Sequence, residues 1–418
     1  MTRPRRLGDL TPPELATLLP ELLLAGHLID RAGMPHAISA FGLEGMRDIA
    51  IEEWMGASPV YTKRMQRALG FEGDSVEVIF KGMQLDVGAP PQFMDFRYVV
   101  HDHDRGEFHL DHCGALMDVE PMGDDFVVAM CHDIEDPTFD ATAIATNVRA
   151  QVRPVHRPPR TPADRHPHCA WTVTIAADHE PLPIPAIAER MGRTHAARAT
   201  LTAIDPTEEG RTDYAGPLLD DLRFADWAPS ALVRTAEEVC LQGHLLALSY
   251  QEALRARGAD DDQVRSIARK QLAGIAGLTS ERLRAALALP ADLDGAAQVL
   301  LLHPALLPAA YVDVTVTLDD RLVLRLGRGD GATADGAWPS LIDADHTEPL
   351  DALLRGVDAR LRADVLAADD DALVVEVVTD DEPAPEADEV ALTRFSTGAT
   401  FAFADRGTPV EIGLSPRG

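Results

Sequence analysis

The two halves of this chain carry the same order of structural signals, and this repeat limits the folds that the chain can adopt. The string Ala-Gly-His-Leu at residues 25–28 recurs as Gln-Gly-His-Leu at 242–245, each time in a leucine-rich segment with helical spacing. A predicted β-hairpin at 96–110 has a counterpart at 311–326. Because helices, hairpin and strand keep their order, we predict an α+β fold with an internal duplication. Each half would have N-terminal helices followed by an antiparallel sheet; two unrelated α+β domains are the alternative.

The repeat divides the chain into three parts. Residues 1–150 are the N-terminal α+β half, 151–230 a Pro- and Arg-rich connector with a strand and a helix, and 231–418 the C-terminal half. Acidic pairs at 124–125 and 370–371, each followed by an apolar run, predict equivalent strands. Hydrophobic residues stand in the second hairpin near the positions of the first hairpin's histidines, so we expect the C-terminal half to be a degenerate copy.

Local signals place the individual elements. Thr11 and Glu14 form a capping box with Pro12 in the first turn, which predicts a helix from there to about residue 32. Prolines between 150 and 168 predict an extended connector. The remaining predicted elements are helices at 42–54, 61–69 and 186–200 and strands at 96–103, 107–113, 126–132 and 170–176.

The chain is strongly acidic, which bounds its partners. Its 418 residues include 68 Asp and Glu against 38 Lys and Arg, a formal charge of −30. Such a surface repels phosphate backbones and anionic lipids, so we expect neither nucleic acid nor a membrane as partner. Four scattered cysteines, no signal-peptide core and no bilayer-spanning run predict a cytoplasmic protein with reduced thiols. We expect a small-molecule substrate, and a homodimer is compatible with this composition.

The first hairpin concentrates side chains that bind divalent metals or move protons. With a three-residue turn at 104–106, His103 would oppose Glu107. His101 would then oppose His109. One face would be apolar, and the other would collect the predicted ligands His101, His103, Glu107, His109 and Cys113.

Two histidines and a carboxylate on adjacent strands match a two-His-one-carboxylate metal site, which favours Fe(II). A thiolate from Cys113 would shift the preference toward Zn(II). Open positions on the metal would admit water, oxygen or substrate. We therefore predict a metal-dependent enzyme, an oxidoreductase or a hydrolase, that acts on a small organic molecule. Without a metal, the same face would be an ordinary solvated surface.

The spacing His101-x-His103-x-x-x-Glu107 resembles the first metal motif of the cupin family. The resemblance covers about one hairpin and implies that these three side chains are metal ligands. Asp95 stands where the leading glycine of that motif is expected, and no second motif follows. The resemblance therefore supports the ligand geometry and not a cupin fold.

The segment after the hairpin supplies three further candidate catalytic residues. His132 and Glu135 are predicted to transfer protons, because they lie near the proposed metal ligands in sequence but outside that set. Cys131 or Cys113 is the candidate nucleophile of an alternative, a metal-independent thiol hydrolase or lyase. A small-molecule or metal sensor is the alternative that is not an enzyme. Three methionines between 117 and 130 either fill the core or line a substrate pocket.

Overall fold

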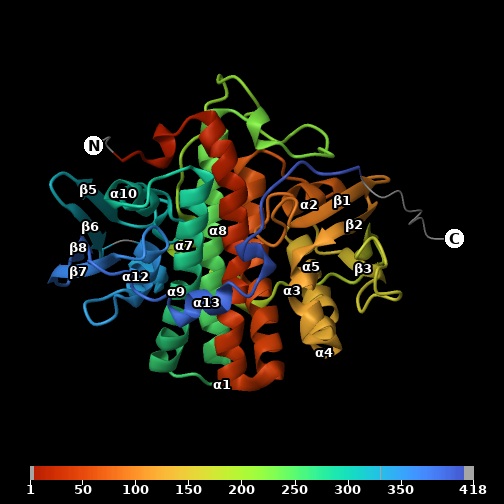
Figure 1. Ribbon diagram of the computed structural model, residues 1–418. Coiled ribbons are helices and arrows are strands. Elements are labelled where there is room, and N and C mark those ends of the chain that lie inside the picture. The colour runs from red at the N-terminus through yellow and green to blue at the C-terminus, as the bar shows by residue number, and fades with distance from the viewer. Residues whose placement is uncertain (1–3, 330, 409–418) are drawn as a thin grey trace.

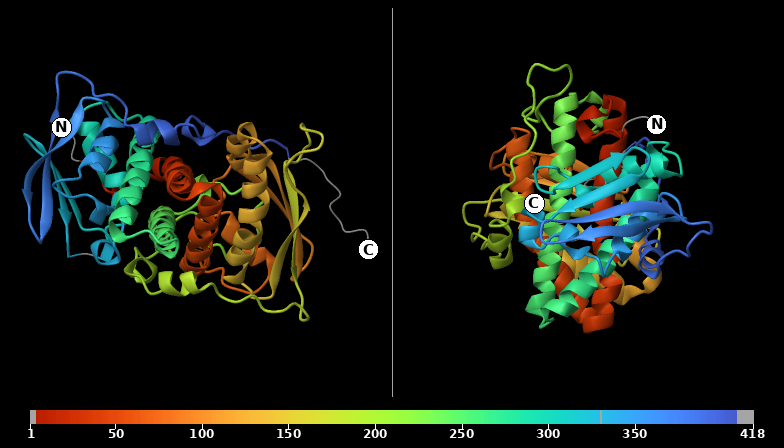
Figure 2. Two further views of the ribbon diagram at one scale, coloured as in Figure 1. Left: turned by 90° about the horizontal axis from the view of Figure 1, so that it is seen from below. Right: turned by 90° about the vertical axis from the view of Figure 1, so that its left-hand side faces the viewer.

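The computed structural model describes residues 4–329 and 331–408. Long helices fill its centre, and a four-stranded antiparallel sheet lies at each end (Figure 1). Seen from below, both sheets stand edge-on with the helices between them (Figure 2). This arrangement confirms an α+β architecture. Within the described ranges, none of the helices combines the length and hydrophobicity that a membrane span requires.

The first helix, α1 (Pro12–Ala68), begins at the predicted capping box and folds back on itself at Gly42. Gly42 has φ 71° and ψ −179°, a conformation that glycine adopts without strain. The two segments of α1 lie side by side in Figure 1. Pro59 stays inside the second segment, so the predicted separation into helices at 42–54 and 61–69 was wrong. Pro59 is buried, and its packing outweighs the backbone hydrogen bond that proline removes.

The first sheet has the strand order β1-β2-β4-β3, and every neighbouring pair is antiparallel. β1 (Met94–Val100) and β2 (Arg105–Cys113) form the predicted hairpin. β3 (Ala150–His156) lies inside the segment predicted to be an extended connector. It is an edge strand, and Pro154 is tolerated there because one side of an edge strand makes no ladder hydrogen bonds. β4 (Cys169–Ile175) confirms the strand predicted after the connector.

The second sheet has the same order, β5-β6-β8-β7, and is again antiparallel throughout. β5 (Val314–Leu318) and β6 (Leu322–Gly327) confirm the predicted second hairpin. β7 (Leu361–Ala368) and β8 (Ala372–Thr379) complete the sheet. Both ends of the molecule therefore share one strand topology.

The segment predicted as a strand at 126–132 is helical. α4 (Asp124–Val128) continues into a π-helical turn, η3 (Ala129–Ile134), and then into α5 (Glu135–Ile144). The predicted equivalence with the strand after 370–371 was therefore wrong, because only the latter is a strand. A short apolar run fits either structure, and here burial follows the spacing of one helix face. The buried side chains of that face are Val127, Met130, Cys131 and Ile134.

Further helices flank the sheets and join the two halves. α8 (Pro229–Ala256) packs along α1, and α9 (Asp261–Ala286) packs beside both. The helix predicted at 186–200 is present as two short helices, α6 and α7. The other α-helices and their bounds are α2 (Val76–Met83), α3 (Gly114–Val119), α6 (Ala186–Met191), α7 (His195–Arg198), α10 (Leu293–Leu302), α11 (Gly331–Asp335), α12 (Glu348–Arg355) and α13 (Asp388–Thr393). Short 3₁₀ turns are η1 (Leu7–Asp9), η2 (Glu120–Met122), η4 (Phe224–Asp226), η5 (Pro304–Leu306), η6 (Trp338–Leu341) and η7 (Thr397–Ala399).

Packing ties the first sheet both to its own helices and to the end of the chain. Phe139 of α5 lies against Phe108 of β2, with ring centroids 5.3 Å apart. The segment after α13 crosses to the first half, where Ser396 and Thr397 donate hydrogen bonds to Asp118 of α3. Side chains from distant parts of the sequence thus meet beside α3.

Candidate functional site

The first hairpin has a different register from the one predicted. Val99 pairs with Glu107, and Arg97 pairs with His109. The turn spans residues 101–104, so the predicted pairing of Glu107 and His109 with the two turn histidines was wrong. An aspartate side chain accepts a backbone hydrogen bond inside this turn and stabilises the longer loop. The register changed by an even number of residues, so the division into a polar and an apolar face holds.

The predicted metal ligands converge in part. His101 Nε2 lies 3.1 Å from Glu107 Oε1 on the polar face. His109 is on the same face, but its Nε2 lies 3.2 Å from Asp111 Oδ1. Among the described residues, no group of three or more His, Cys, Asp or Glu side chains is close enough to hold a metal ion.

His103 and Cys113 lie apart from the other predicted ligands. The exposed His103 ring sits at the turn, with Nε2 3.1 Å from Asp74 Oδ1. Cys113 is buried, and its sulfur lies 3.9 Å from the sulfur of Met94. A bulge in β1 between Met94 and Phe96 shifts the register at that end of the hairpin. Cys113 therefore belongs to the apolar core.

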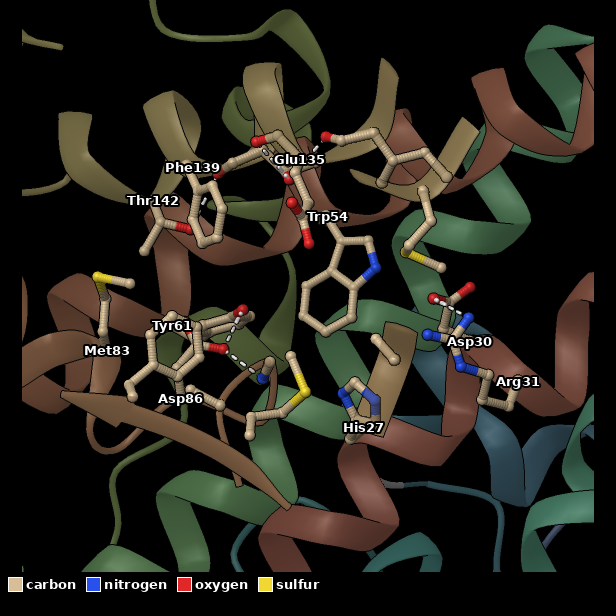
Figure 3. Close-up of a pocket in the computed structure, with 18 residues that line it drawn as sticks. His27, Asp30, Arg31, Trp54, Tyr61, Met83, Asp86, Glu135, Phe139 and Thr142 are labelled. Carbon is tan, nitrogen blue, oxygen red and sulfur yellow. Dashed lines mark hydrogen bonds and ion pairs between the residues drawn. The ribbon is translucent and has the colours of Figure 1, made fainter. Parts of the chain in front are cut away.

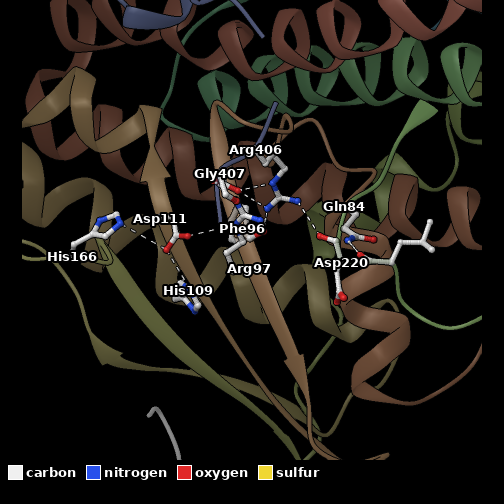
Figure 4. A network of polar contacts seen from close by, with 11 residues as sticks. Gln84, Phe96, Arg97, His109, Asp111, His166, Asp220, Arg406 and Gly407 are labelled. Atoms are coloured by element: carbon white, nitrogen blue, oxygen red, sulfur yellow. Dashed lines mark hydrogen bonds and ion pairs between the residues drawn. The ribbon is translucent and has the colours of Figure 1, made fainter. Parts of the chain in front are cut away.

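The polar face of the hairpin holds the C-terminal segment (Figure 4). The Arg406 Nε donates a 2.7 Å hydrogen bond to Asp95. Arg97 donates to Asp95 at 3.0 Å and to the Gly407 carbonyl at 2.9 Å. Asp111 lies 3.5 Å from Arg97. These contacts pair the charges of this face and fasten the C-terminal segment to β1.

The π-helical turn contains Cys131 and His132. Burial raises the pKa of Cys131, and it raises the pKa of Cys113 to about 12. Thiolates are therefore disfavoured at both positions near neutral pH. His132 Nε2 donates a 2.6 Å hydrogen bond to the Pro158 carbonyl, which ties the turn to the loop before β4.

Glu135, the third predicted catalytic residue, lines a cavity of about 100 Å³ between α1, β1 and α5 (Figure 3). That volume holds about three water molecules or one small polar group. Both segments of α1 contribute side chains to it, because the fold-back at Gly42 brings them together. Several methionine and phenylalanine side chains form its apolar walls. Its polar and aromatic lining includes His27, Asp30, Arg31, Trp54, Tyr61, Asp86 and Glu135.

The Glu135 carboxyl is neutral at pH 7. Burial raises its pKa from 4.5 to about 8; Asp136 raises it further, and Arg157 and Arg31 oppose the rise. Its Oε2 is buried and has no hydrogen-bond partner in the described part of the chain. A protonated carboxyl with an unpaired oxygen is a proton donor available to a bound molecule.

Asp86 supplies a second carboxyl on a different wall. It accepts hydrogen bonds from the Tyr61 hydroxyl at 2.8 Å and from the Gly88 amide at 2.7 Å. Burial raises the pKa of Asp86 to about 6, although both hydrogen bonds lower it. At neutral pH Asp86 is mainly ionised while Glu135 is mainly protonated.

His27 is the buried base of the cavity. Only 4% of its surface is exposed, and neither ring nitrogen has a hydrogen-bond partner among the residues described. Burial, with a smaller effect of Arg31, lowers the pKa of His27 to about 3. The ring packs edge-on against Phe93, with centroids 5.4 Å apart. A neutral imidazole with unused nitrogens thus faces the cavity (Figure 3).

An ion-pair cluster closes another wall. Arg31 lies 3.8 Å from Asp30 and 3.4 Å from Asp118. Burial raises the pKa of Asp30. Glu53 is 1% exposed, and neither of its oxygens is hydrogen-bonded within the described ranges. Burial and the nearby Asp30 raise the pKa of Glu53 well above its ordinary value. This side of the site has more carboxyl groups than cations.

A larger apolar pocket of about 410 Å³ adjoins the cavity. Arg31, Met130 and Ile134 line both spaces. Phe395, 68% exposed, and Leu392, 46% exposed, stand on its wall and come from the C-terminal half. The pocket's volume is typical of small-molecule sites.

The second Gly-His-Leu string has different surroundings. His244 Nε2 bonds the Leu307 carbonyl at 2.8 Å, and the Trp338 ring lies 5.1 Å away. Three and four residues later stand Ala247 and Leu248, where α1 has Asp30 and Arg31 after His27. The charged pair is therefore specific to the first half.

Reasoning from sequence found Glu135 but missed its neighbours. Asp30 and Arg31 interrupt a leucine-rich helix, and that interruption was the available signal. The positions of Tyr61 and Asp86 depend on how the helices pack.

Comparisons with protein-family models, curated proteins and solved structures found no match. Function is therefore inferred from the geometry of the cavity.

Proposed function

We propose that the N-terminal half binds a small organic molecule in the cavity beneath α5 and exchanges a proton with it through Glu135. The observation that carries this proposal is that the His27 ring and Glu135 Oε2 face the same small cavity and have no hydrogen-bond partner within residues 4–329 and 331–408. Buried polar groups without partners are costly in a protein that leaves them empty. A bound molecule with its own polar groups would satisfy them.

The two carboxyls support acid–base chemistry. Glu135, with a pKa of about 8, would act as the general acid, and Asp86, with a pKa of about 6, as the general base. They approach from different walls, so a ligand between them could gain a proton at one atom and lose one at another. The Tyr61 hydroxyl orients Asp86 through its 2.8 Å hydrogen bond. A sensor that binds the same molecule without turning it over is the alternative.

We further propose that the two halves are an ancient duplication in which only the first kept a site. Both sheets have one strand order, which supports this. The repeated histidines also have matching ring neighbours: His27 meets Phe93 edge-on, and His244 meets Tyr311 edge-on. In the second half the Trp338 ring packs against His244, whereas in the first half the charged cluster lies next to His27.

Saturation-transfer NMR tests the binding proposal, using a set of amines, alcohols, carboxylates and phenols of similar size as probes. Thr138→Leu adds bulk to the cavity wall, and Glu135→Gln removes the acid. We expect at least one probe class to bind the wild type and to lose its signal in both variants. Asp125→Asn removes an exposed charge from the neighbouring helix α4 and is the control. The proposal fails if no probe distinguishes the wild type from Thr138→Leu.

A metal-dependent oxidation or hydrolysis at the hairpin is the second proposal, with Fe(II) or Zn(II) on His101 and Glu107. The 3.1 Å contact between these side chains favours it, and His109 lies on the same face. Elemental analysis of protein purified without added metal tests it. We expect one iron or zinc per chain that is lost in His101→Ala; metal at less than about a tenth of that level would refute the proposal.

A further inference from the structure

Three neighbouring features of the site point to one class of ligand. They are the excess of carboxyl groups around the cavity, the Trp54 indole in its lining, and the apolar pocket that adjoins it. The first two select a positively charged head group, and the third selects a hydrocarbon chain.

The carboxyl groups around the cavity favour a positively charged ligand. Asp30, Asp86 and Glu135 line the space, and Glu53 is buried beside Asp30. Among the described residues that line the cavity, Arg31 is the only cation, and it is already shared between Asp30 at 3.8 Å and Asp118 at 3.4 Å. Burying uncompensated carboxylates is unfavourable, so a positive group entering this space would be attracted. An anionic group would meet three carboxyls and one occupied guanidinium.

The His27 nitrogens and Glu135 Oε2, which make no hydrogen bond within the described chain, favour a ligand with several N–H groups. His27 is buried, and both its nitrogens lack partners within the described chain, as does Glu135 Oε2. A primary ammonium group carries three N–H donors and fits a space of about 100 Å³. The Trp54 indole lines the same space (Figure 3), and indole faces attract cations.

The adjoining apolar pocket favours a hydrocarbon part of the ligand. Met34, Ile38 and Phe126 contribute to its apolar lining, and its volume is about 410 Å³. Met130 and Ile134 separate it from the cavity. Methionine is unbranched and adapts its conformation easily, so this wall can give way to a chain.

We propose that the ligand is a hydrophobic primary amine, with its ammonium group in the cavity between Glu135, Asp30 and Trp54 and its hydrocarbon chain in the apolar pocket. This inference rests on the proposed function, because it uses the same cavity. Binding needs no covalent step. The amine enters in its neutral form and takes the proton of Glu135, so the ammonium formed ion-pairs with the Glu135 and Asp30 carboxylates. His27 accepts one N–H, and the chain displaces water from the apolar pocket.

Isothermal titration calorimetry with butylamine, hexylamine and octylamine tests the two parts separately. Each pair of added methylenes should tighten binding roughly tenfold as the chain fills the apolar pocket. Glu135→Gln should weaken all three amines by about tenfold and keep their chain-length dependence. Ile38→Trp fills the apolar pocket, so it should abolish the chain-length dependence and leave butylamine unchanged. Asp125→Asn, a charge-matched control at an exposed position of the neighbouring helix α4, should change affinity less than about twofold.

Octanol and octanoate are the matched probes for the head group. We expect octanoate to bind at least about tenfold more weakly than octylamine. If octanol or octanoate binds as tightly as octylamine and with the same dependence on Ile38→Trp, the amine assignment is overturned while the cavity remains a binding site. If no probe binds the wild-type chain, both this inference and the proposed function are overturned.

Discussion

Replacing Glu135 by Gln should make the protein more stable at alkaline pH, although it removes a group proposed to function. The carboxyl has a pKa of 4.5 when unfolded and about 8 when folded, so the folded state holds a proton that the unfolded state releases between these pH values. A group whose pKa is raised on folding contributes stability at low pH and loses it as the pH rises. The loss begins near pH 4.5 and is complete above about pH 8.

The magnitude follows from the same linkage. Each pH unit across this window costs about 1.4 kcal/mol, which gives an upper limit of about 5 kcal/mol. Glu135 is only partly buried, and solvent screening reduces the effect to about 2 kcal/mol. Glutamine has nearly the same shape and does not titrate. Near pH 5 the variant should therefore match the wild type, and near pH 8 it should be about 2 kcal/mol more stable.

Urea unfolding followed by circular dichroism, at intervals from about pH 4.5 to 8.5, measures this difference. Asp125→Asn is the control, because Asp125 is an exposed carboxylate on the neighbouring helix α4. Its stability curve should run nearly parallel to that of the wild type. If the stability curves of Glu135→Gln and the wild type were parallel, the Glu135 carboxyl would not be buried and protonated in the folded protein. Its proposed role as the general acid would then be refuted as well.

Two further predictions concern packing and the thiols. A Cβ at Gly26 would lie 2.4 Å from Val87 Cγ1, so Gly26→Ala should destabilise the protein by about 1–3 kcal/mol in the same urea assay. At Gly243 the atom nearest to an added Cβ is 3.2 Å away, so Gly243→Ala should lower the stability by less than about 1 kcal/mol. Equal losses at the two glycines would contradict this close approach of α1 to the segment after α2. All four cysteines are buried, so a disulfide reagent such as DTNB at about pH 8 should label them only after unfolding; rapid labelling of one thiol in the native protein would instead support the thiol-dependent alternative.

The elements that could be predicted from the sequence were those with a local signal. The capping box at Thr11 starts α1, and alternation of polar and apolar residues located both hairpins and the faces of the first. The register of that hairpin depended on an aspartate hydrogen bond within its turn, which alternation does not encode. The apolar run at 126–132 was too short to separate a strand from a helix.

The candidate site was predictable only in part for a similar reason. Glu135 stood out as a possible proton donor near other reactive residues, and it lines the cavity. Asp86 and Tyr61 are 25 residues apart and meet because the chain after α2 packs back against the second segment of α1. The charge excess around Asp30 is likewise a property of packing, since its carboxyl neighbours come from separate helices.

The crossing of the C-terminal segment to the first half has a consequence for biosynthesis. Ser396 and Thr397 fasten it to Asp118, while Leu392 and Phe395 stand on the pocket wall. A nascent chain that has already made α1, the first sheet and α5 still lacks that wall until residues 392–397 have been synthesised. Products terminated before residue 392 would therefore emerge with an incomplete pocket, and ligand capture would report on whether translation had passed that point.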